Sequence, residues 1–96
     1  MQYLYTKRYL KRFDRFPRQE QLLLLEADHQ IRTYYSTRQA PHGLGLKLLH
    51  TAGSNKVLEA RVSLSIRLLW AERGNQVSFL LVGSHDEVKR YLRSLR

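Results

Sequence analysis

Hydrophobic and polar residues alternate in four short segments of the second half of the chain. These segments cover residues 44–50, 57–63, 65–70 and 77–82. A period of two places successive side chains on opposite faces of a strand. The alternation therefore predicts four half-buried antiparallel strands in sequence order. The connections between them are short and rich in Gly, Ser and Asn, as expected for hairpins.

The alternation also assigns each side chain to a face of the predicted sheet. One face collects large apolar residues that should pack on helices: Leu44, Leu46, Leu48, Leu58, Ala60, Val62, Ile66, Leu68, Trp70, Val77, Phe79 and Leu81. The other face carries Lys47, Glu59, Arg61 and Arg67. Glu59 and Arg61 are same-face neighbours on one strand, so an ion pair between them is expected.

The polar face has two interpretations. An antiparallel sheet often leaves one side in water, which by itself explains polar residues there. Basic residues on three successive strands also suit a phosphate-binding surface. Leu49, Leu69 and Leu80 fall within this face, and we expect them to form a shallow apolar patch.

The first half of the chain predicts a strand and two helices. Residues 2–5 suit a strand, and Thr6 can cap the helix that follows, whose apolar stripe is Tyr9, Leu10 and Phe13. A second helix is expected from Pro17 to Arg38. Its apolar stripe, at a spacing of three and four, consists of Leu24, Ala27, Ile31, Tyr34 and Tyr35. The two helices are predicted to form a hairpin on the apolar face of the sheet.

The first helix also carries a basic cluster interleaved with aromatic residues. Its members are Lys7, Arg8, Lys11, Arg12 and Arg15. Nucleic-acid-binding proteins use such a combination. A solvated helix face is the other interpretation, and it is favoured because Tyr9 and Phe13 at helical spacing usually belong to a core.

A capping box marks the start of a last helix, with Ser84 at the cap and Glu87 three residues later. The predicted buried stripe is Val88, Leu92 and Leu95. His85 takes the first helical position, directly after the fourth strand of the alternating region. Free N–H groups at a helix N-terminus favour an anion, so His85 is a candidate site residue.

Composition bounds the function. Ninety-six residues suit one α+β domain, residues 1–96. Seventeen Lys and Arg against eight Asp and Glu give a net charge of +9, and Arg is the commoner base. This balance favours nucleic acid or a strongly acidic protein as partner. There is no cysteine, no apolar stretch long enough to span a membrane and no zinc-like histidine spacing. We therefore expect a cytoplasmic protein without a metal or other cofactor and without membrane association.

Three segments in order resemble the RelE/ParE superfamily of toxins from bacterial and archaeal type II toxin–antitoxin systems. Residues 45–49 (GLKLL) resemble the lysine-containing strand of that family. Residues 57–62 (VLEARV) and 65–70 (SIRLLW) resemble its paired strands. Residues 79–91 (FLLVGSHDEVKRY) resemble its last strand and its "G-x-H-D-E-V-x-x-Y" ending. Residues 2–38 match in architecture only.

The resemblance implies a fold and an activity. The fold is an N-terminal strand, a helical hairpin on an antiparallel sheet of four or five strands, and a short C-terminal helix. RelE-like members are ribosome-dependent endoribonucleases that cut translated mRNA, and an acidic antitoxin binds them. The positions that match the family's catalytic places are Arg61, Arg67, His85 and Tyr91. Nucleic-acid binding is expected from Arg61 and Arg67, together with the two basic residues Lys47 and Lys56.

Each implied catalytic residue has a chemical role. Arg61 and Arg67 would hold phosphate oxygens with planar forks. His85 would act as acid or base, since its unperturbed pKa lies near neutrality. Tyr91 would stack a base or share proton transfer. Some nucleolytic relatives have a glutamate base near the lysine strand, but Leu44 and Gly45 stand there in this chain, which leaves the general base open.

Three other functions remain open at this stage. A ParE-like toxin would inhibit DNA gyrase and would not cut mRNA. A non-catalytic domain would bind nucleic acid through its basic residues. A degenerate family member would act only as a partner for an acidic antitoxin.

Overall fold

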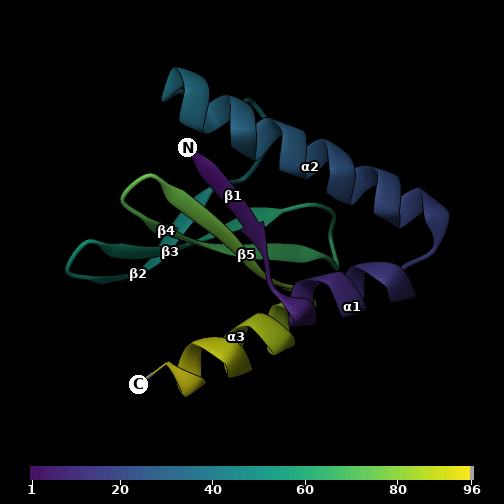
Figure 1. Cartoon of the computed structure of the whole chain (residues 1–96). Coiled ribbons are helices and arrows are strands. Elements are labelled where there is room, and N and C mark those ends of the chain that lie inside the picture. The colour runs from purple at the N-terminus through teal and green to yellow at the C-terminus, as the bar shows by residue number, and fades with distance from the viewer. Residues whose placement is uncertain (96) are drawn as a thin grey trace.

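The chain forms a five-stranded sheet with three helices in the computed structural model, which describes residues 1–95 (Figure 1). The strands are β1 (Gln2–Tyr5), β2 (Lys47–Ala52), β3 (Asn55–Arg61), β4 (Arg67–Arg73) and β5 (Gln76–Gly83). The helices are α1 (Lys7–Arg15), α2 (Arg18–Thr37) and α3 (His85–Ser94). This α+β architecture confirms the predicted order of elements.

The strands lie in the order β1-β5-β4-β3-β2. The pairs β2–β3, β3–β4 and β4–β5 are antiparallel, as predicted. β1 pairs with β5 in parallel, so the five-stranded sheet as a whole is mixed, and its antiparallel part has four strands. The predicted start of the first alternating strand at residue 44 was wrong. β2 begins at Lys47, because the left-handed backbone at Gly45 (φ 62°) interrupts the extended chain.

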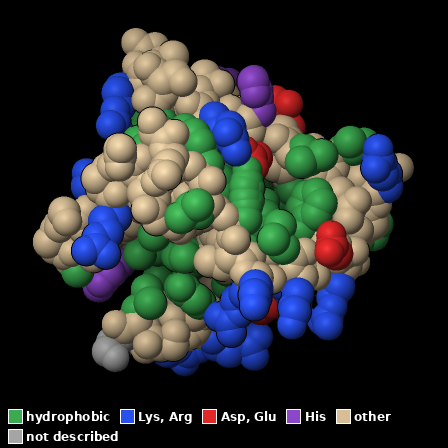
Figure 2. Space-filling model, in the orientation of Figure 1, with side chains coloured by type: hydrophobic (Ala, Val, Ile, Leu, Met, Phe, Trp, Pro, Cys, Tyr) green, Lys and Arg blue, Asp and Glu red, His purple; other side chains and the backbone are tan. Residues whose placement is uncertain are grey.

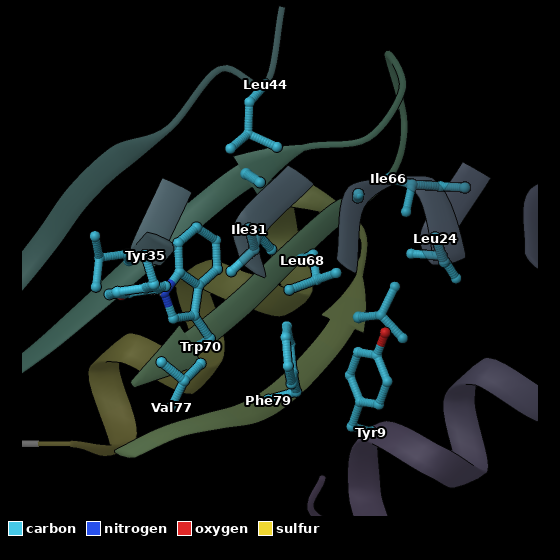
Figure 3. Packing of buried hydrophobic residues seen from close by; sticks show 14 residues of the cluster. Tyr9, Leu24, Ile31, Tyr35, Leu44, Ile66, Leu68, Trp70, Val77 and Phe79 are labelled. Atoms are coloured by element: carbon cyan, nitrogen blue, oxygen red, sulfur yellow. Dashed lines mark hydrogen bonds between the residues drawn. The ribbon is translucent and has the colours of Figure 1, made fainter. Parts of the chain in front are cut away.

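The larger core lies on the face of the sheet that α1 and α2 cover (Figure 1). In Figure 3, Leu24, Ile31 and Tyr35 of α2 and Tyr9 of α1 point toward the sheet side chains. The sheet residues in this cluster include Leu68, Trp70, Val77 and Phe79, all fully buried. The predicted stripe of α2 is confirmed. Leu10 of α1 is 47% exposed, so its place in the apolar stripe was wrong.

Helix α3 covers part of the opposite face. Its Val88 is buried against Val57, Leu69 and Leu81, and Leu49, Leu80, Tyr91 and Leu92 pack around them. The exposed apolar patch expected at Leu49, Leu69 and Leu80 was therefore wrong, because α3 closes over it. Leu95, which is 41% exposed, ends the buried stripe of α3 earlier than predicted.

A register shift between β4 and β5 explains why one face prediction failed. Leu69 pairs with Leu81 and Trp70 pairs with Phe79, so Leu80 is an extra residue without a partner. A bulge of this kind changes the phase of the alternation. Val77 and Phe79 face α2 as predicted, whereas Leu81 turns to the α3 face. The period-two pattern had placed Leu81 with Phe79, which was wrong.

Both predicted helix caps are present. The Thr6 side chain accepts a hydrogen bond from the backbone N–H of Tyr9 at the start of α1. At α3 the Ser84 hydroxyl accepts from the Glu87 N–H, and the Glu87 carboxylate accepts from the Ser84 N–H. The capping box fixes the start of α3 directly after β5, which sets the path of this helix over the sheet.

A hydrogen-bond chain crosses the larger core. Trp70 Nε1 donates to the Tyr35 hydroxyl over 2.9 Å, and that hydroxyl donates to Glu72 Oε1 over 2.8 Å. Burial raises the pKa of Tyr35 above the ordinary range of a phenol, so the hydroxyl stays protonated. Tyr35 thus links α2 to β4 through two partners.

We predict that Tyr35→Phe lowers the free energy of unfolding by about 1–3 kcal/mol, because the buried Trp70 N–H loses its acceptor. Chemical denaturation measures this change. The neighbouring Tyr34→Phe is the matched control, and we expect a change within about 0.5 kcal/mol. Equal effects of the two substitutions would contradict a specific role for the Tyr35 hydroxyl.

Candidate functional site

Four charged side chains lie together on the α3 face of the sheet, beyond the part that α3 covers. Lys47 is directly opposite Glu59, and Arg61 is directly opposite Arg67. Opposed residues of antiparallel strands share a face, with Cβ atoms about 4.5–5.5 Å apart. We name these four residues the charged cluster. Their formal charges leave an excess of two positive charges on this surface.

Arg67 forms the floor of the charged cluster. Its side chain is 10% exposed, and its Nε lies 3.3 Å from Glu59 Oε1. Its Nη1 donates to the backbone carbonyls of Ser63 and Leu64 over 3.1 and 3.4 Å. These contacts hold the guanidinium in one place.

The expected ion pair between Glu59 and Arg61 was wrong. Glu59 lies diagonally across the strand pair from Arg67, and the two side chains meet there. Arg67 is buried and paired with Glu59, so Arg61 and Lys47 are the exposed cations of the charged cluster.

The position of Arg61 depends on Gly45. The backbone N–H of Arg61 donates to the Leu44 carbonyl over 3.2 Å, which brings the segment before β2 against the end of β3. A Cβ atom at Gly45 would lie 3.2 Å from the Arg61 Cβ. Glycine is therefore required here both for its left-handed backbone and for the close approach.

His85 stands at the end of the charged cluster. Gly83 pairs with Arg67 across β4 and β5, and His85 follows two residues later as the first residue of α3. Its side chain is exposed. Lys47, Arg61 and Arg67 are thus brought together on three strands, and His85 begins the helix that leaves their edge of the sheet.

Two other predicted site residues lie elsewhere. Lys56 and Glu59 lie on opposite faces of β3. Lys56 pairs with Thr51 and Glu72 and lies on the α2 face, as Leu58 does. Tyr91 follows His85 by six residues, which turns it about 120° around α3. The charged cluster does not include these two side chains.

Tyr91 lines a groove between α1 and α3 instead. The groove has a volume of about 440 Å³ and is lined by Arg8, Arg12, Leu81, Glu87, Arg90, Tyr91 and Ser94. We name it the α1–α3 groove. The Arg8 guanidinium lies 5.6 Å from the centre of the Tyr91 ring, and Arg12 Nη2 lies 2.7 Å from Glu87 Oε1. Figure 2 shows lysine and arginine side chains gathered on the side of the molecule where α1 and α3 lie.

The basic residues of α1 are the sequence signal for this groove, although helical spacing favours a solvated face for them. Spacing along one helix cannot show that a second helix runs beside it. The contact of Arg12 with Glu87, seventy-five residues later, is what converts the basic face into one wall of a groove.

Within residues 1–95 no three His, Asp or Glu side chains gather closely enough to hold a metal ion. No helix in the same range is long and apolar enough to cross a membrane.

Solved structures share this fold at low sequence identity. The RelE–RelB complex of Pyrococcus horikoshii matches with a TM-score of 0.71 at 14% identity, over 86% of this chain and 92% of that chain. The chain has a RelE/ParE-like toxin fold. The YoeB/ParE toxin of Agrobacterium tumefaciens matches at 0.63 and 14% identity, over 88% and 99% of the two chains. The RelB–RelE complex of Methanococcus jannaschii gives the same TM-score and identity, over 92% and 96%. No family model and no curated protein matches the chain.

We predict that Gly45→Ala destabilises the protein more than Gly53→Ala. Both glycines have φ 62°, but a Cβ at Gly53 would meet no atom within 4 Å. The left-handed backbone alone costs an alanine about 1–2 kcal/mol, which both variants should show. Thermal or chemical denaturation should reveal an additional loss only at Gly45, where Arg61 must move. Equal losses would show that the close approach to Arg61 is unimportant.

Proposed function

We propose that the protein is the toxin of a type II toxin–antitoxin system and acts as a ribosome-dependent endoribonuclease on translated mRNA. The observation that carries this proposal is the charged cluster on a RelE-like fold, with Arg61 exposed and Arg67 fixed beside it. This places cations at the edge of the sheet where His85 begins α3. Such a surface can hold an RNA phosphate near a histidine, a residue type that serves as general acid or base.

RNA supplies its own nucleophile in the proposed reaction. A base removes the proton of a ribose 2′-hydroxyl, and the oxygen attacks the adjacent phosphorus. The bond to the 5′-oxygen of the next nucleotide breaks, and an acid protonates that oxygen. The products are a 2′,3′-cyclic phosphate and a 5′-hydroxyl, so no water is consumed in this step.

The residues of the site take different roles in this proposal. Arg61 binds the phosphate oxygens and stabilises the negative charge that develops on them. Lys47 adds positive charge on the neighbouring strand. Arg67, held by Glu59, shapes the floor of the site. His85 serves as acid or base. Lys56 and Tyr91 are left out of the reaction because they lie away from the charged cluster.

An acidic antitoxin is the proposed protein partner. Two of the similar structures are complexes of RelE with RelB. The net charge of +9 favours an acidic partner here as well. The ribosome and mRNA are the proposed targets, and the cytoplasm is the proposed place of action.

The ion pair of Arg67 with Glu59 favours a second candidate function. An arginine that is buried and paired contributes less to binding a phosphate than a free one. A ParE-like toxin, which acts on DNA gyrase without cutting RNA, needs no such cation. One similar structure is described as a YoeB/ParE toxin.

We predict that expression of the protein produces cuts inside translated codons, mapped by primer extension. Arg61→Ala should reduce cleavage about 100-fold or more, because one preorganised phosphate contact is lost. His85→Ala should reduce it by a similar factor through loss of proton transfer. Arg73→Ala removes an exposed cation at the far end of β4 and is the matched control, with cleavage expected to stay unchanged.

The outcomes separate the two candidates. Intact mRNA in cells that stop growing, together with inhibited DNA supercoiling, would move the assignment to the gyrase-directed toxin. Equal cleavage by wild type and both site variants would refute the assignment of the site.

A further inference from the structure

The α1–α3 groove lies apart from the charged cluster and plays no part in the proposed reaction. We propose that it is a second binding site, for the backbone of a single-stranded nucleic acid with one base stacked on Tyr91. This inference does not rest on the proposed function, because it concerns binding alone.

The charge of the groove is the first argument. Three arginines line it, Arg8, Arg12 and Arg90, against one carboxylate, Glu87. Arg12 pairs with Glu87 at 2.7 Å, whereas Arg8 and Arg90 have no carboxylate within 4 Å among residues 1–95. Two exposed guanidinium groups from two helices therefore face this groove, and such forks suit phosphate oxygens.

The basic surface extends beyond the groove. A second, shallower hollow of about 340 Å³ on α1 is lined only by basic residues: Lys7, Arg8, Lys11, Arg12 and Arg15. Arg8 and Arg12 line both hollows, so the two are adjacent. A row of cations along adjacent hollows suits an extended polyanion better than a single small anion.

The lining of the groove favours nucleic acid over an acidic peptide. Leu81 is its only aliphatic side chain and is 5% exposed, so the groove offers almost no apolar anchor for a peptide helix. Tyr91 is half-buried, and the Arg8 guanidinium lies over its ring. An unpaired base can take the place of the Arg8 guanidinium over this ring, and stacking of this kind accepts any base.

Fluorescence anisotropy of a labelled twelve-nucleotide 2′-O-methyl oligouridine tests the proposal with the whole protein. This probe lacks the 2′-hydroxyl nucleophile, so the result is independent of cleavage. The double variant Arg8→Gln with Arg90→Gln should weaken binding about 25-fold at 0.1 M salt. The slope of log affinity against log salt concentration should fall in magnitude by about 1.4, because each single-strand phosphate contact contributes about 0.7. Circular dichroism verifies folding. If this double variant does not fold, Lys7→Gln with Lys11→Gln should lower the slope similarly.

The matched control removes two exposed arginines elsewhere, with Arg38→Gln at the end of α2 and Arg73→Gln at the end of β4. Its affinity and salt slope should remain close to those of the wild type. Equal weakening by the control would show diffuse attraction by net charge and would overturn the site.

Tyr91 has its own test. Tyr91→Leu should weaken binding about fivefold or more, whereas Tyr91→Phe should bind nearly as wild type because it retains the stacking face. No difference between the two would overturn the stacked base. A poly-glutamate peptide of twelve residues that binds as tightly as the oligonucleotide would overturn the assignment to nucleic acid.

Discussion

A register shift between β4 and β5 changes which face of the sheet the later residues of β5 supply. Before the shift, Val77 and Phe79 supply the core beneath α2, and after it Leu81 turns to the opposite face. Leu81 then joins Leu69 and Val57 as the surface on which Val88 of α3 packs. Leu80 packs around the same cluster, and Val82 returns to the core beneath α2. The bulge therefore adds Leu81 to the surface on which α3 docks.

The docking of α3 in turn divides the second face into two regions. The apolar part is buried under the helix, and the charged cluster remains open beside it. Arg61, Arg67 and Gly83 lie opposite one another across β3, β4 and β5. The capping box at Ser84 starts α3 two residues after Gly83. The other flank of α3 meets α1 through Arg12 and Glu87. One short helix therefore separates two basic surfaces, which explains how His85 and Tyr91 come to lie in different places.

Much of this arrangement could be predicted from local patterns. Alternation located four strands, and caps at Thr6 and Ser84 located the starts of two helices. These signals depend on neighbouring residues, which the sequence contains directly. The phase of β5 could not be predicted, because the bulge is set by pairing with β4 and not by the residues 77–82 themselves.

Contacts in the site that depend on long-range pairing could not be predicted from the sequence either. Lys47, Arg61 and Arg67 could be placed on one face, since strand periodicity is enough for that. The partner of Glu59 could not, because it depends on the register between two strands. The parallel pairing of β1 with β5 and the groove between α1 and α3 likewise join segments more than seventy residues apart. Resemblance to a family supplied the general fold but not these contacts.

In the proposed reaction, mRNA is bound to the ribosome, and the charged cluster promotes attack by a 2′-hydroxyl of this mRNA on the adjacent phosphorus. The most direct test programmes purified ribosomes with an mRNA that carries a single 2′-deoxynucleotide on the 5′ side of the mapped cut. We expect the wild-type protein to cleave the all-ribose mRNA, to leave a 2′,3′-cyclic phosphate, and not to cut at the deoxy position. Continued cutting at the deoxy position would contradict the proposed reaction, because the nucleophile would then not be the 2′-hydroxyl.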